Sequence, residues 1–122
     1  MLARLGRILA FAVGKREIVI AKDTREVLEL MHGRVRTVFD RRSRNVLQNG
    51  RVVASMALVD RIELHFPMTQ QGTPNWYVTV HIRGGRQVEV GQATDSTDAS
   101  IIAARIAGIT ERNVVVHPKP AR

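Results

Sequence analysis

The sequence predicts an α+β fold in which a strongly bent antiparallel sheet, or partial barrel, is capped by one C-terminal helix. Apolar and polar residues alternate with a period of two over much of residues 34–91, which is typical of strands with one covered face. At Asp95 the period changes to that of an amphipathic helix. An open antiparallel sheet with one helix across a face fits the same pattern, because periodicity does not report the curvature of a sheet.

The first part of the sheet is expected to be a meander of short strands. Residues 34–39 alternate and then reach a polar turn over residues 40–43. After the next strand, Asn49 and Gly50 predict a type I′ hairpin turn, because both residue types accept positive φ. Residues 51–58 form the returning strand.

The second part contains the clearest hairpin of the chain. A strand over residues 61–66 and a polar loop over 67–75 precede it. Residues 76–90 then alternate on both sides of Gly84 and Gly85, which supply the turn. We interpret this hairpin as scaffold, because its apolar residues would lie under the helix.

The helix is expected to begin after Asp95, which is a suitable N-cap, and Asp98 suits the positive end of the helix dipole. Gly108 is placed to end the helix in a left-handed conformation. Five small or branched apolar residues make a stripe at helical spacing: Ala99, Ile102, Ala103, Ile106 and Ala107.

Residues 17–33 are expected to hold one short helix. Thr24 would cap its start and Gly33 would follow its end, with Val27, Leu28 and Met31 between them. Isoleucines near residue 18 leave a strand open as an alternative.

We therefore divide the chain into a basic N-terminal extension over residues 1–33, weakly ordered or a short helix, a single domain over 34–117 and a loose tail over 118–122. The apolar run within residues 1–16 is too short to cross a bilayer, and no signal peptide is evident. Residues 1–16 form either a frayed end or a basic amphipathic helix on a membrane surface. We expect a cytoplasmic protein, with membrane association through residues 1–16 as the alternative.

Three stretches together resemble the bacterial pleckstrin-homology-like domains: 39-FDRRSRNV-46, 76-WYVTV-80 and 90-VGQATDSTDASIIAARIA-107. The resemblance covers residues 34–117 and implies a curved sheet plugged by a helix, in a binding or scaffolding module. In lipid-binding members the loop between the first two strands holds anionic headgroups. By this resemblance, the residues to suspect here are Arg41, Arg42 and Arg44.

The charge of the chain also favours an anionic partner. It has 19 Lys and Arg against 11 Asp and Glu, a net charge of +8, and residues 1–51 alone carry 12 basic and 5 acidic residues. Arg41, Arg42 and Arg44 stand in or beside one tight turn, where several guanidinium groups can hold a phosphate. Alternatively, these arginines only protect a strand edge and keep the protein soluble.

We find no pattern of catalytic or metal-binding residues. Cysteine is absent, which excludes disulfides and thiolate chemistry. A two-histidine metal site at His65 and His81 is conceivable but has no supporting spacing, and none of the four serines lies in a nucleophile motif. Asp95 and Asp98 are explained by the helix start. We expect the protein to have no catalytic activity and to bind no metal ion or cofactor.

The function we expect is that of a non-catalytic binding module whose partner is a protein or an anionic membrane surface. A protein that binds the phosphate backbone of nucleic acid is the second possibility, although aromatic residues make up only 4% of the chain and offer no platform for base stacking. An enzyme with an unrecognised site is the third.

Overall fold

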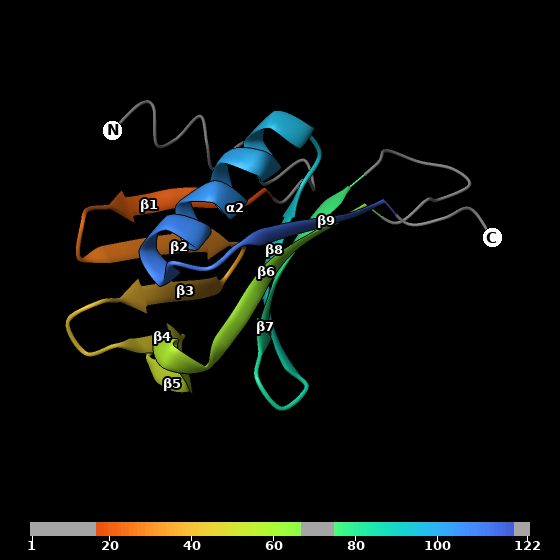
Figure 1. Cartoon of the computed structure of the whole chain (residues 1–122). Helices are drawn as coiled ribbons and strands as arrows, with labels where there is room; N and C mark the ends of the chain where they lie inside the picture. Colours follow the sequence, from red (N-terminus) through yellow and green to blue (C-terminus); the bar gives the residue numbers. More distant parts are fainter. Residues whose placement is uncertain (1–16, 67–74, 119–122) are drawn as a thin grey trace, which may run out of the picture.

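The computed structural model describes residues 17–66 and 75–118, which form two β-sheets and one α-helix (Figure 1). The first sheet is an antiparallel meander: β1 (Val19–Asp23), β2 (Val27–His32), β3 (Val35–Asp40), β4 (Asn45–Gln48) and β5 (Arg51–Ser55). The second sheet has the order β8-β7-β6-β9: β6 (Val59–Phe66), β7 (Trp76–Ile82), β8 (Arg86–Ala93) and β9 (Val114–Pro118). A 3₁₀ turn, η1 (Met56–Leu58), joins the sheets, and α2 (Ser96–Thr110) precedes β9.

The predicted α+β class with a C-terminal helix is confirmed. The strands form two open sheets rather than the partial barrel, so the open arrangement is the correct one. The chain leaves the first sheet at Ser55, whose hydroxyl accepts a hydrogen bond of 3.3 Å from the N–H of Ala57 and starts η1. A second contact between the sheets lies next to β1, where Ile18 donates its N–H to the carbonyl of Gln92 in β8 at 3.1 Å.

The helix predicted over residues 17–33 is wrong, because β1 and β2 form a hairpin there. Thr24 closes its turn: the hydroxyl accepts hydrogen bonds from the N–H groups of Glu26 at 3.2 Å and Val27 at 3.0 Å. Leu28 and Leu30 are almost completely buried on the inner face of β2. Since β2 pairs with β3 along its whole length, the boundary set at residue 33 falls inside the first sheet.

The predicted hairpin turns are confirmed. Asn49 and Gly50 have φ values of 50° and 84°, as a type I′ turn requires. Gly84 and Gly85 connect β7 to β8, also with positive φ. On β7 the residues alternate as predicted, with Val78 and Val80 buried.

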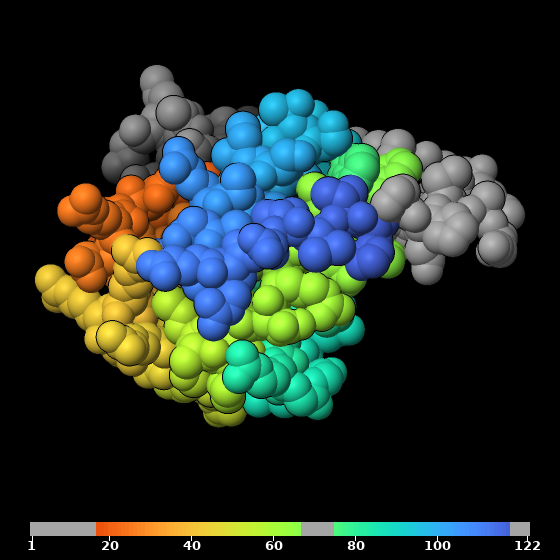
Figure 2. Space-filling model, viewed as in Figure 1, coloured from red at the N-terminus to blue at the C-terminus, as the bar shows by residue number. Residues whose placement is uncertain are grey.

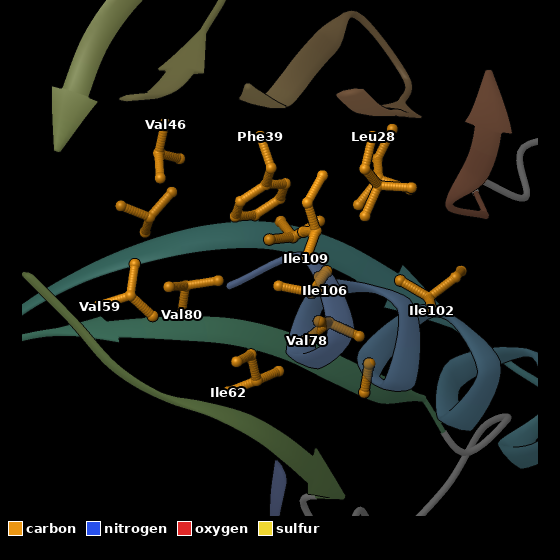
Figure 3. Close-up of a cluster of buried hydrophobic side chains, with 14 of the residues drawn as sticks. Leu28, Phe39, Val46, Val59, Ile62, Val78, Val80, Ile102, Ile106 and Ile109 are labelled. Atoms are coloured by element: carbon orange, nitrogen blue, oxygen red, sulfur yellow. The ribbon is translucent and has the colours of Figure 1, made fainter. Parts of the chain in front are cut away.

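The core lies between the inner faces of the two sheets and is completed by α2 (Figure 3). Each sheet contributes alternate residues, as the period of two requires. The helix contributes the predicted stripe of branched and small side chains. Fully buried members include Phe39 and Val46 from the first sheet, Ile62, Val78 and Val80 from the second sheet, and Ile106 from α2.

Both ends of α2 are capped, but only one as predicted. Asp95 accepts a hydrogen bond of 3.0 Å from the N–H of Thr97, which confirms it as the N-cap. The predicted stop at Gly108 is wrong, because the helix continues to Thr110 and ends at Glu111 with φ of 59°. Ile109 and Thr110 are buried, so packing extends the helix beyond the glycine.

The apolar run at 114–116 forms β9, which pairs parallel to β6 (Figure 1). This pairing places His117 beside His65 and Val115 beside Glu63. The predictions made for residues 1–16, for the loop over 67–74 and for the tail beyond residue 118 lie outside the described residues. Within the described part, no helix has the length and apolar character needed to cross a membrane.

Candidate functional site

The arginine-bearing turn at residues 41–44 connects β3 to β4. Asp40 organises it: one carboxylate oxygen accepts the N–H of Arg42 at 3.0 Å and the other accepts the hydroxyl of Ser43 at 3.1 Å. Arg44 ends the turn with φ of 62°. The resemblance to pleckstrin-homology-like domains pointed to the loop between the first two strands. The turn at residues 41–44 is not that loop, because β1 and β2 precede it.

Two adjoining cavities lie at this end of the molecule, one of about 460 Å³ and one of about 210 Å³. They are bordered by the β1–β2 turn, the β3–β4 turn and the end of α2. Figure 2 shows the blue end of α2 next to the orange β1–β2 hairpin and the yellow β3–β4 turn. Arg41 and Ile109 line both cavities. The larger cavity adds Arg44 and Arg112, and the smaller one adds Arg25 and Arg105.

Of the three predicted arginines, Arg41 and Arg44 therefore lie at one site. Arg42 is exposed but lines neither cavity. We call the combined feature the arginine end: Arg25, Arg41, Arg44, Arg105 and Arg112 around the two cavities.

Arg41 holds the end of the helix. Its Nε donates to the carbonyl of Ile109 at 3.3 Å, and its Nη2 forms an ion pair of 3.1 Å with Glu111. The last turn of α2 contains no basic residue of its own, so Arg41 supplies the positive charge that stabilises helix carbonyls. A structural role therefore occupies much of this guanidinium group.

Arg112 is also a structural residue. Its guanidinium donates to the carbonyls of Val59 at 2.7 Å, of Ala57 at 3.3 Å and of Glu111 at 3.3 Å. These bonds connect the end of α2 to the segment that joins the two sheets. They leave little of Arg112 available for a ligand.

Arg25 and Arg44 differ from the other arginines of this end. Both are exposed, and within residues 17–66 and 75–118 neither side chain forms a hydrogen bond or an ion pair. Arg105, by contrast, is paired with Asp23 at 3.1 Å. Among the described residues, three acidic ones, Asp23, Glu26 and Glu111, line the same cavities against five arginines, so the described part of the arginine end has an excess of positive charge.

Three of the four histidines, His65, His81 and His117, lie on strands of the second sheet. His81 and His117 each place Nε2 at 2.7 Å from a different carboxylate oxygen of Glu63. An ionised carboxylate only accepts hydrogen bonds, so both imidazoles donate through Nε2. Burial alone would raise the pKa of Glu63, but the hydrogen bond from His81 and the charges of His81, His117 and Arg61 together lower it from the usual 4.5.

Within the described part of the chain, no group of three or more His, Asp or Glu residues is arranged to hold a metal ion. Of the two histidines considered for a metal site, His81 is hydrogen-bonded to Glu63 at 2.7 Å. Two of the four serines considered as nucleophiles have structural roles: Ser43 donates to Asp40, and Ser55 caps η1.

Sequence reasoning missed Arg25, Arg105 and Arg112 as members of the arginine end. Arg25 was missed because residues 17–33 were predicted to form a helix rather than a hairpin. A hairpin there would have placed its turn beside the β3–β4 turn, because alternate turns of a meander lie at the same end of a sheet. For Arg105 and Arg112 the sequence holds no local signal, since α2 approaches the first sheet only through tertiary packing.

No family model, curated protein or solved structure matches this chain.

Proposed function

We propose that this protein is a non-catalytic binding module that takes a phosphate- or carboxylate-bearing partner at the arginine end. The observation that carries the proposal is the pair of exposed guanidinium groups, Arg25 and Arg44, that flank Arg41 without partners in the described part of the chain. Arginine in such a position binds oxyanions through two parallel hydrogen bonds. The net charge of +8 would attract an anionic partner from a distance.

The partner is either an acidic protein surface or the anionic surface of a membrane. Both kinds of partner present phosphate or carboxylate groups to the arginines. The cavities are large enough for a headgroup or a pair of carboxylates, and Arg25, Arg41 and Arg44 stand on turns of the first sheet.

Binding to anionic vesicles, to a polyglutamate peptide and to duplex DNA tests the proposal. The informative variant is Arg25→Gln with Arg44→Gln, because it removes two charges and spares Arg41 and Arg112, which hold the helix. A matched control is Arg51→Gln with Arg83→Gln, two exposed arginines that line neither cavity; Arg51 begins β5 and Arg83 follows β7. All variants should keep the wild-type melting temperature.

We expect binding to at least one of the anionic probes to weaken about tenfold or more in the Arg25/Arg44 variant and to change little in the control. Binding should also fall as salt is raised from about 50 to 200 mM. Tighter binding to vesicles would identify a membrane surface as the partner, and tighter binding to polyglutamate would identify an acidic protein. Tighter binding to DNA would favour nucleic-acid binding instead. Equal loss in both double variants would show that only net charge matters and would overturn the site.

A further inference from the structure

The outer face of the second sheet carries polar side chains in rows across its strands. Register places Glu63 of β6 beside Thr79 of β7, and Thr79 beside Glu89 of β8. The next row consists of His65, Tyr77 and Gln92. Rows on one face of a sheet are about 7 Å apart, so the two carboxylates and the tyrosine ring border a common area.

That area is hollow because its floor is a short side chain. Thr79 is 8% exposed and lies between the longer Glu63 and Glu89. A cavity of about 320 Å³ lies here, lined by both glutamates, Tyr77 and Thr79. A second cavity of about 390 Å³ continues along β8 over Gly91 and shares Tyr77 and Glu89 with the first. We call the two together the β7–β8 groove.

The charge of the β7–β8 groove is opposite to that of the whole chain. Among the residues that the structure describes, no Lys or Arg lines either cavity. The carboxylate of Glu63, which is 15% exposed, is held in place by its contacts with His81 and His117. Glu89 is exposed, and its carboxylate has no hydrogen bond or ion pair among the described residues.

Tyr77 adds an aromatic surface at the point that both cavities share. Its side chain is 36% exposed, and it lies on the outer face of the sheet between His65 and Gln92. The face of an aromatic ring attracts ammonium groups, and carboxylates beside it add direct charge attraction.

We infer that the β7–β8 groove binds an organic cation, an ammonium group that reaches the hollow above Thr79 between Glu63, Glu89 and Tyr77. The ammonium belongs either to a small amine or to a lysine side chain of a partner. An organic group suits these cavities better than a bare metal ion. A metal ion needs several ligand atoms within about 2.6 Å of one point, and the described residues provide no such group. This site is separate from the arginine end and does not depend on it.

A titration followed by amide NMR tests this inference on the full chain. Suitable probes are tetramethylammonium, a capped glycine–lysine–glycine tripeptide and the matching glutamate tripeptide as a charge control. We expect saturable shifts at Tyr77, Glu89 and Gly91 with one or both cations and none with the glutamate peptide. Stronger binding of the lysine peptide identifies a protein partner, and stronger binding of tetramethylammonium identifies a small methylated amine.

The variants separate the groove from general surface charge. Glu89→Gln and Tyr77→Ala should each weaken binding about tenfold, whereas Tyr77→Phe should keep it. Asp60→Asn removes an equal charge from β6 outside both cavities and should change affinity less than about twofold. Each variant is first checked for an unchanged melting temperature.

Shifts that do not saturate, or equal weakening by Asp60→Asn and Glu89→Gln, would overturn the inference. The Arg25/Arg44 variant should bind the cations as the wild type does. Loss of anion binding at the arginine end and loss of cation binding in the groove can therefore be told apart.

Discussion

The carboxylate of Glu17 accepts two hydrogen bonds from Thr94, one of 2.7 Å from the hydroxyl and one of 3.1 Å from the backbone N–H. The contact joins the start of the first sheet to the residue before the N-cap of α2. Glu17 and Thr94 are separated by most of the chain, so their hydrogen bonds help to hold the helix across both sheets.

Replacing Thr94 by Val should lower the free energy of unfolding by about 1 kcal/mol, because Glu17 loses its hydroxyl donor while the side chain keeps its shape. Urea unfolding measures the change. Thr97→Val serves as the control, since the Thr97 side chain is exposed and forms no hydrogen bond within the described residues. Similar losses in the two variants would mean that the contact with Glu17 adds nothing.

Glu63 should make stability depend on pH at the acid end. Its folded pKa lies below the unfolded value of 4.5, so its contribution is fully present above pH 4.5 and is lost as the pH falls through the lower folded pKa. We expect Glu63→Gln to be less stable than the wild type at neutral pH, with the difference shrinking below pH 4.5. Unfolding curves of both proteins measured between pH 3 and 7, a range of about four units around this carboxyl pKa, check the sign. A difference that stays constant with pH would contradict the assignment.

Gly91 occupies a position that no larger residue fits. A Cβ there would lie 2.6 Å from Cγ of His32 and 2.7 Å from Cγ1 of Ile18, with φ of 151°. Gly91→Ala should therefore destabilise the protein by more than about 2 kcal/mol. Gly108→Ala is the matched change within α2, where nothing lies within 4 Å, and it should stabilise by about 0.5–1 kcal/mol. The two changes are compared by thermal or urea unfolding, and equal effects would refute the close approach at Gly91.

Arg112→Met should destabilise the protein by about 2 kcal/mol, because three carbonyls lose a charged donor while most of the apolar stem is kept. Arg83→Met removes an equal charge from an exposed turn and should have little effect on the urea midpoint. If Arg112→Lys restores stability fully, charge rather than the three directed hydrogen bonds is responsible.

Local chemistry made much of the fold predictable. The turn at Asn49 and Gly50, the N-cap at Asp95 and the alternation on β7 are each set by a few neighbouring residues, and all three predictions are confirmed. Thr24 and Gly33 misled because the residue types that cap helices also close hairpins. The structure uses Thr24 in the β1–β2 turn and Gly33, with φ of 63°, in the turn before β3.

The candidate site was less predictable, because tertiary contacts build it. Arg41 and Arg44 could be selected from one basic turn, but the sequence could not show that Arg41 is bonded to the end of α2. The contact between Glu63 and His117 depends on the parallel pairing of β9 with β6. Parallel pairing of distant strands has no short-range turn signal, so nothing near residue 117 indicates it.

β9 also has a consequence for how concentrated solutions of this protein behave. It is an edge strand of the second sheet, it contains three consecutive valines, and Val116 is 52% exposed. Apolar, β-branched edges recruit strands from other molecules, so slow association at high concentration should begin at β9. Val116→Lys should delay that association in light scattering without lowering the melting temperature, and an unchanged rate would direct attention to a different edge.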